Sequence, residues 1–256
     1  MIRGLYTSAM GMILQEKRQS NISNNLSNIE TNAFKKQEII ARAFDRVEVL
    51  NRDNGSRRLT PIGGMHLGVQ VDDLYGDFQQ GQLKETNETL DFAIEGTGFF
   101  TIQLPDGNIA YTRDGSFKVD GNGYLATKQG YLVMARNPIS GGLESIPLDR
   151  DQVQVDDMGR MTLTNGQVYL LNIVDFPDHQ QLRRLGENLY VLDGGQPMVA
   201  VDYKIMQGFL ERSNVNPLEE MVKMIEVTRS FESNQKAVQS MDETLGKAVN
   251  EVGKVG

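Results

Sequence analysis

Residues 216–252 read NPLEEMVKMIEVTRSFESNQKAVQSMDETLGKAVNEV, and this stretch decides the fold prediction. One apolar series recurs every seven residues, at Met224, Phe231, Val238, Leu245 and Val252. A second series lies three residues after each of the first four, at Val227, Asn234, Met241 and Ala248. Spacings that alternate between three and four are the a/d pattern of a helix that packs along a partner helix. The stretch therefore predicts a helix about 50 Å long that needs a partner along its length.

The start of this helix is encoded locally. Asn216 is a favourable N-cap residue, Pro217 suits the first helical position, and Glu219 stands at the third, which together form a capping-box arrangement. We therefore expect the helix to begin at Pro217. Asn234 is a polar member of the seam, and such a residue can fix the register between helices at a cost in stability. A slightly rotated helix that exposes Asn234 to water explains the pattern equally well.

The N-terminal residues 1–35 also predict an amphipathic helix. Its apolar stripe has two parts separated by polar residues: Ile2, Leu5, Ala9, Met12 and Ile13, and then Ile22, Leu26 and Ile29. Asn residues crowd the second part, at Asn21, Asn24, Asn25, Asn28 and Asn32. Because Asn is a poor helix former, these amides indicate either contacts made by side chains or a frayed, solvated helix end.

The middle of the chain has the pattern of short strands and tight turns that is typical of a β protein. Short apolar runs such as Phe99–Leu104 and Val168–Val174 alternate with turn dipeptides. Asp-Gly and Asn-Gly pairs supply the positive φ angles of tight hairpin turns. They occur at Asp106-Gly107, Asp114-Gly115, Asp120-Gly121, Asn122-Gly123, Asn165-Gly166 and Asp193-Gly194. We therefore predict an all-β middle of hairpins.

The predicted fold class is α+β, with long N- and C-terminal helices that form a coiled-coil domain around this β-rich middle. The predicted domains are residues 1–35 with 211–256, a linker or extended arm at 36–66, and a β-rich body at 67–210 in one or two lobes. Residues 1–36 carry five basic and two acidic side chains, a charge of +3, whereas residues 207–256 carry six basic and eight acidic ones, a charge of −2. Opposite signs favour pairing of these segments, although exposed ion pairs contribute only about 0–1 kcal/mol each.

Composition excludes several classes of function. The net charge of −8 and the lack of basic blocks argue against nucleic-acid binding. The chain has no Cys, which excludes disulfides and thiol chemistry. The two histidines, His66 and His179, have no supporting cluster, and we find no nucleophile elbow, phosphate loop or calcium loop. We therefore expect no enzyme activity, no catalytic residue, no cofactor and no metal.

We also expect no membrane span and no cleaved apolar leader. No apolar run approaches the roughly 18–20 residues that span a bilayer. Polar and charged residues, from Gln15 to Arg18, interrupt the N-terminal apolar stripe. If the protein is exported, it must use a route that does not read such a leader.

At this point the sequence resembles the flagellar axial proteins, the rod and hook proteins of the bacterial flagellum, and most closely the distal-rod class FlgG and FlgF. The resemblance covers nearly the whole chain. It rests on motifs in the same order: 24–28 (NNLSN), 31–35 (TNAFK), 92–100 (FAIEGTGFF), 111–117 (YTRDGSF), 207–211 (QGFLE) and 213–217 (SNVNP). Where the family usually has Gly, this chain has Ala33.

The resemblance implies a structural subunit of the basal-body rod. Such a subunit polymerises into a helical tube that transmits torque and surrounds the export channel. Its implied partners are copies of itself, other axial subunits and the flagellar type III export apparatus, and its implied location is the basal body, outside the cytoplasmic membrane. The alternative is a secreted β-rich module with coiled-coil arms that binds the cell wall or acts as an adhesin. The predicted assembly interface is the helical seam together with Asn25: Leu5, Met12, Ile22, Asn25, Leu26, Ile29, Met224, Val227, Phe231, Asn234, Val238, Met241 and Leu245.

Overall fold

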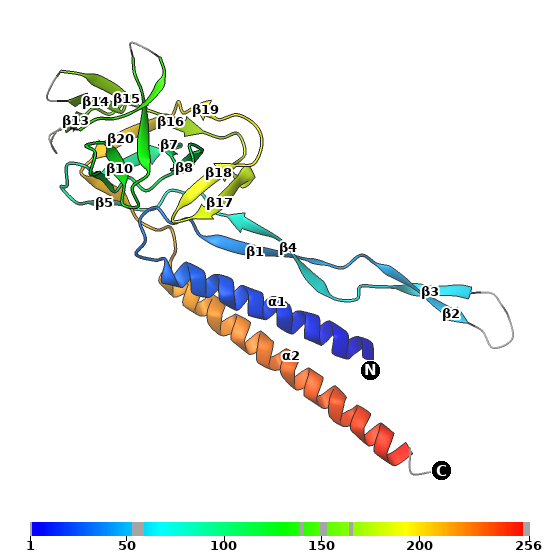
Figure 1. Cartoon of the computed structure of the whole chain (residues 1–256). Helices are drawn as coiled ribbons and strands as arrows, with labels where there is room; N and C mark the ends of the chain where they lie inside the picture. The colour runs from blue at the N-terminus through cyan, green and yellow to red at the C-terminus, as the bar shows by residue number, and fades with distance from the viewer. Residues whose placement is uncertain (1, 53–58, 139–140, 149–152, 164–165, 253–256) are drawn as a thin grey trace. The chain divides into compact units, whose positions relative to one another are not determined.

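The fold is that of a computed structural model, which describes residues 2–52, 59–138, 141–148, 153–163 and 166–252 (Figure 1). The chain forms two compact units. Unit 1 comprises Met1–Leu26, Gln37–Tyr75 and Asn216–Gly256, and unit 2 comprises Ser27–Lys36 and Gly76–Val215. Each unit is thus assembled from segments that are far apart in the sequence.

Unit 1 contains the α-helices that are found within the described residues. Helix α1 spans Ile2–Ser27 and helix α2 spans Pro217–Val252. The predicted cap of α2 is confirmed, because the Asn216 side-chain oxygen accepts a hydrogen bond from the Leu218 N–H at 3.1 Å. The Asn216 amide also donates to Glu219 at 3.1 Å, and Glu219 and Glu220 place negative charge in the first turn.

Unit 1 also contains two β-ribbons. Strand β1 (Gln37–Ala43) pairs with β4 (Val69–Gly76), and β2 (Val47–Arg52) pairs in antiparallel fashion with β3 (Leu59–Met65). The β2–β3 register shifts between Val49 and Leu50, which marks a bulge. Several apolar side chains of these strands are exposed, including Ile40, Leu50, Ile62 and Leu74.

Unit 2 is the β-rich body, and it includes one short 3₁₀ helix, η1 (His179–Gln181). Within the described residues, its main sheet has 13 strands, with β13-β14-β15-β11-β7-β8-β18-β17 as its principal path. The described strands are β5 (Leu83–Glu85), β6 (Phe92–Gly96), β7 (Phe99–Gln103), β8 (Ile109–Thr112), β9 (Phe117–Val119), β10 (Leu125–Thr127), β11 (Leu132–Arg136), β12 (Leu143–Ser145), β13 (Val153–Val155), β14 (Arg160–Leu163), β15 (Val168–Leu171), β16 (Ile173–Asp175), β17 (Leu182–Gly186), β18 (Leu189–Leu192), β19 (Met198–Val199), β20 (Tyr203–Gln207) and β21 (Phe209–Glu211).

Several predicted turns are hairpin turns. Asp106-Gly107 joins β7 to β8, with Gly107 at φ 83°, and residues 120–123 join β9 to β10. Asn165 lies outside the described residues, but Gly166, at φ 82°, precedes β15 in the β14–β15 pair. By contrast, Asp193-Gly194 follows β18 and leads to β19, which pairs with β16. A dipeptide signal thus predicts the local turn but not the partner of the next strand.

Strand β7 lies between two cores because its successive side chains point to opposite faces. Phe99 packs in a cluster with Tyr111, Phe176 and Tyr190, whereas Phe100 belongs to the larger core. Both phenylalanines are almost fully buried.

The prediction of a coiled-coil domain built from long terminal helices is wrong. The described residues contain one α-helix near each end of the chain, and β-structure dominates the middle. The unit that contains the helices also contains the ribbons β1–β4. The heptad spacing identified the apolar side of α2, but it could not show that strands share the same unit. The α+β mixture itself agrees with the structure.

The first helix is also shorter than expected, because it ends at Ser27 rather than near residue 35. The chain then turns, and Ala33 adopts φ 52°, a left-handed conformation that favours glycine. The Ala33 N–H donates to the Glu211 carbonyl at 2.8 Å, which holds this turn against the C-terminal end of the body. The division into terminal domain, arm and body stays a prediction.

Candidate assembly surface

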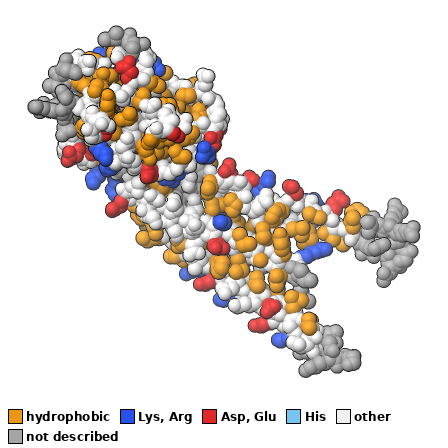
Figure 2. All heavy atoms as spheres, viewed as in Figure 1, with side chains coloured by type: hydrophobic (Ala, Val, Ile, Leu, Met, Phe, Trp, Pro, Cys, Tyr) orange, Lys and Arg blue, Asp and Glu red, His pale blue; other side chains and the backbone are white. Residues whose placement is uncertain are grey.

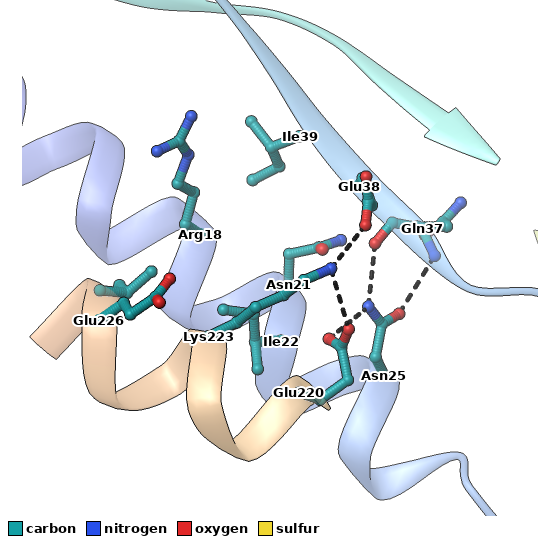
Figure 3. A pocket seen from close by; sticks show the side chains of 11 residues that line it. Arg18, Asn21, Ile22, Asn25, Gln37, Glu38, Ile39, Glu220, Lys223 and Glu226 are labelled. Atoms are coloured by element: carbon teal, nitrogen blue, oxygen red, sulfur yellow. Dashed lines mark hydrogen bonds and ion pairs between the residues drawn. The ribbon is translucent and has the colours of Figure 1, made fainter. Parts of the chain in front are cut away.

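Asn25 of α1 is the centre of a buried polar network in unit 1 (Figure 3). Its side-chain amide donates to the Gln37 carbonyl at 2.9 Å and to Glu220 Oε2 at 3.1 Å. Its side-chain oxygen accepts from the Gln37 N–H at 3.2 Å. Asn25 and Glu220 are each only 1% exposed. One amide therefore joins α1, the start of β1 and the first turn of α2.

Lys223 extends this network toward solvent. Its ammonium group donates to Glu38 Oε1 at 2.7 Å and lies 3.4 Å from Glu220 Oε1 (Figure 3). Burial lowers the pKa of Lys223, but the hydrogen bonds and charges of Glu38 and Glu220 outweigh this and raise it. A cavity of about 230 Å³ opens beside the network, lined by Arg18, Asn21, Ile22, Asn25, Gln37, Glu38, Ile39, Glu220, Lys223, Glu226 and Val227.

Contacts along the helices define their register. A Cβ atom added to Gly4 would lie 2.9 Å from Met241 Cε, and one added to Gly11 would lie 3.1 Å from Asn234 Nδ2. Asn25 meets Glu220 further along. Residue numbers on α2 therefore decrease as the numbers of the facing residues on α1 increase, so the two helices are antiparallel. The glycines, seven residues apart, lie against seam side chains of α2.

The predicted assembly residues lie mainly on the sheltered sides of the two helices. Ile22, Asn25 and Val227 are buried. Ile29 lies beyond the end of α1, in the segment that belongs to unit 2. The remaining positions are partly buried: Leu5, Met12, Leu26, Met224, Phe231, Asn234, Val238, Met241 and Leu245.

The helices also have a second apolar surface that the sequence did not predict, and it includes Ile13, which was expected on the apolar stripe of residues 1–35. Tyr6 and Ile13 of α1 and Leu218, Met221, Val222 and Ile225 of α2 are exposed. Figure 2 shows hydrophobic side chains that reach the surface over the helical part of unit 1. The spacing of three, four and seven from Leu218 to Ile225 is the signal that could have revealed the α2 part.

A buried charge cluster in unit 2 was also missed; it consists of Lys35, Arg113 and Glu211. Glu211 accepts from Lys35 at 2.5 Å and from Arg113 at 3.0 Å, and it also accepts from the Gly81 N–H at 2.8 Å. Lys35 further donates to the Gln79 carbonyl, and Arg113 donates to the Gly96 carbonyl. The three residues of the charge cluster come from widely separated segments, and each is at most 4% exposed.

Other site chemistry is limited in the part of the chain that the structure describes. No group there of three or more His, Asp or Glu side chains could hold a metal ion. None of the helices in those residues has the length and apolar character that crossing a membrane requires.

Comparisons with known proteins decide the family. The family described as "Flagellar basal body rod FlgEFG protein C-terminal" matches residues 206–251, and "Flagellar hook protein FlgE/F/G D1 domain" matches residues 93–169. The flagellar basal-body rod protein FlgG of Buchnera aphidicola subsp. Schizaphis graminum is 38% identical, over 96% of this chain and 98% of its own. The chain belongs to the flagellar rod FlgG family. The FlgG proteins of Borreliella burgdorferi (35% identity, 98% of both chains) and Bacillus subtilis (32%, 98% of this chain and 99% of its own) agree.

As a FlgG-family member, the chain is a structural subunit of the flagellar basal-body rod and not an enzyme. It is located in the basal body, beyond the cytoplasmic membrane, and assembles with copies of itself and other axial subunits. Nothing in these relatives favours the cell-wall-binding or adhesin alternative.

Proposed function

We propose that the chain polymerises into a helical tube that transmits torque and surrounds the flagellar export channel. We further propose that it reaches the growing tip through the flagellar type III export apparatus. The first proposal depends on the observation that each helix has two apolar surfaces. Each helix packs one side against the other helix and leaves large apolar side chains exposed on another side. Exposed apolar patches of this kind are typical of surfaces that bind other proteins.

The predicted seam residues are part of this proposal. We infer that those seam residues that lie within α1 and α2 hold the two helices together, so that the helix pair acts as one stiff element within the polymer. The Asn25 network supports this role, because removing one partner leaves the buried carboxylate of Glu220 without the Asn25 amide donor.

The test is complementation of a strain that lacks the gene. The full chain should restore motility and complete rods in electron micrographs of basal bodies. A chain that lacks residues 217–256 should be produced but should restore neither. Normal rods in the deletion strain without any complementing chain would contradict the proposal.

The export step has a separate test. The full chain should appear outside the cytoplasm of a strain with an active flagellar export apparatus and stay inside when that apparatus is inactivated. Equal release from both strains would contradict this step while leaving the structural role intact.

A further inference from the structure

The first turns of α2 have an apolar face directed away from α1. We call Leu218, Met221, Val222 and Ile225 the α2 patch; they are 71%, 51%, 49% and 53% exposed. At about 100° per residue, this patch lies roughly opposite the side on which Val227 and Asn234 stand. Later positions on the same outward face are charged and exposed: Arg229, Glu232, Lys236 and Glu243. The apolar surface is therefore confined to one end of the helix.

Helix α1 has a smaller counterpart. Tyr6 and Ile13, which we call the α1 patch, are 48% and 49% exposed. They stand about 180° to 220° around the helix from Gly4 and Gly11, which face α2. Tyr6 and Ile13 are seven residues apart, as are Leu218 and Ile225 in the α2 patch. The two patches therefore have the same axial spacing of apolar side chains.

We propose that the α2 patch of one copy packs against the α1 patch of a second copy. This inference rests on the proposed polymerisation and names the surfaces that carry it. In antiparallel packing, Leu218 lies opposite Ile13 of the other copy, and Ile225 lies opposite its Tyr6. Parallel packing would also align two apolar pairs, Leu218 with Tyr6 and Ile225 with Ile13, so the charged residues beside the patches decide the direction.

Charge complementarity selects a second copy as the occupant. Helix α1 carries three basic and one acidic side chains, a charge of +2, whereas α2 carries four basic and seven acidic ones, a charge of −3. Beside the α2 patch stand Glu219 and Glu226, and beside the α1 patch stand Arg3 and Lys17. In the antiparallel arrangement, Arg3 falls near Glu226 and Lys17 near Glu219, on the same flank of the contact.

The contact has a geometric consequence. It joins two different surfaces, because the α2 patch of each copy binds the α1 patch of the next copy. The contact therefore repeats from copy to copy without a two-fold axis. Within one copy, Ile13 and Tyr6 lie level with Glu232 and Gln239 of α2 along the helix axis. Along the α2 axis, the α1 patch is therefore about 14 residues further toward the C-terminus than the α2 patch. Copies that point the same way are therefore offset by about 20 Å along the helix axis, at 1.5 Å per residue. Such a contact produces an open polymer rather than a closed dimer.

The absence of cysteine from the chain gives a clean test by cross-linking. Full-length protein carrying both Ile13→Cys and Leu218→Cys is assembled, oxidised and run on a non-reducing gel. The proposal predicts a ladder of covalent multimers, since the two positions face away from each other within one chain. The matched control replaces Ile13→Cys with Ser20→Cys, an exposed position on the same side of α1 but about 10 Å further along. We expect at least fivefold less cross-linked product from it.

Two outcomes would overturn the inference. One is sedimentable polymer without a ladder, and the other is an equally strong ladder from the Ser20→Cys control. A dimer formed by the Leu218→Cys single variant alone would show a symmetric contact and would also count against it. Absence of any polymer, together with absence of rods in the complemented strain, is instead a failure of the proposed function.

Substitutions supply a second measurement. Val222→Asp should raise the concentration needed for polymerisation at least tenfold, whereas Val201→Asp, at a 93% exposed valine of unit 2, should leave it unchanged. Glu226→Lys should raise that concentration a few fold, and adding Arg3→Glu should reverse the effect. Equal effects of the two valine substitutions, or no recovery in the double variant, would contradict the proposed contact.

Discussion

At the residue scale, the buried charge cluster explains how two cations can be placed in the interior of unit 2. Each oxygen of Glu211 takes one of them, and backbone groups satisfy the rest. Breaking such a pair is costly because it leaves an uncompensated charge in a place that water does not reach. The carboxylate is the critical member, since both cations depend on it.

We therefore predict that Glu211→Gln lowers the free energy of unfolding by about 3–5 kcal/mol, as for other buried ion pairs that lose one partner. Lys35→Met should cost less, because Glu211 keeps Arg113 and the Gly81 N–H. Urea denaturation of the full chain, followed by circular dichroism, measures both. A Glu211→Gln variant as stable as the parent would refute this account of the cluster.

The pH dependence of stability is a second prediction at this scale. Burial lowers the pKa of Lys35 from 10.5 to about 8; the charge of Glu211 opposes this shift, and that of Arg113 adds to it. Between these two values the unfolded chain binds more protons at Lys35 than the folded one, so stability rises with pH. The rise from pH 8 to pH 10 should amount to about 2 kcal/mol.

Lys35→Met should flatten this rise, which denaturation at several pH values would show. Burial raises the pKa of Tyr190 to about 12, so the unfolded chain loses this proton first and stability falls as pH rises, mainly above pH 10. A rise between pH 8 and pH 10 that persists in Lys35→Met would assign the effect to another group.

At the element scale, the two helices differ in how far the sequence determines them. The start of α2 depends on a hydrogen bond between Asn216 and Leu218, which are neighbours, so the sequence could predict it. The turn that follows α1 includes Ala33, whose N–H donates a backbone hydrogen bond to the Glu211 carbonyl. That partner is distant in the sequence, and the apolar stripe up to Ile29 gave no sign of it.

We predict that Gly11→Val separates α1 from α2, because its side chain would overlap the Asn234 amide. Helicity by circular dichroism and the melting temperature should both fall. Adding Asn234→Ala should recover part of the loss, with a coupling of about 0.5–3 kcal/mol in a double-mutant cycle.

The matched control for this experiment is Gly246→Ala, since a Cβ there meets no described atom within 4 Å. It should instead stabilise α2 by up to about 1 kcal/mol through helix propensity. Additive effects of Gly11→Val and Asn234→Ala would mean that the two positions do not meet.

At the scale of the whole molecule, unit 2 includes residues on both sides of the segment 67–210. Residues 27–36 and Glu211 both belong to unit 2, and they supply two of the three charges in its buried cluster. The predicted body at 67–210 lacks both.

A fragment of residues 27–215 should therefore fold and stay monomeric, because it keeps the cluster and lacks both helices. A fragment of residues 37–210 should melt at a clearly lower temperature, since Arg113 remains without Glu211. Sedimentation velocity and thermal melts measure these properties. Polymerisation of the longer fragment, or equal melting temperatures of the two, would contradict this division of the chain.

The sequence by itself determined the features that depend on neighbouring residues: the cap at Asn216, the hairpin turns at Asp106 and Asp120, the apolar side of α2 and the family. Only the tertiary structure decided that β1–β4 share a unit with the helices, that Asn25 meets Glu220, and that Lys35 is buried against Glu211. The physical reason is the distance along the sequence over which each kind of interaction acts. Local hydrogen bonds and φ preferences act within a few residues, whereas burial and charge pairing depend on which distant segments the fold brings together.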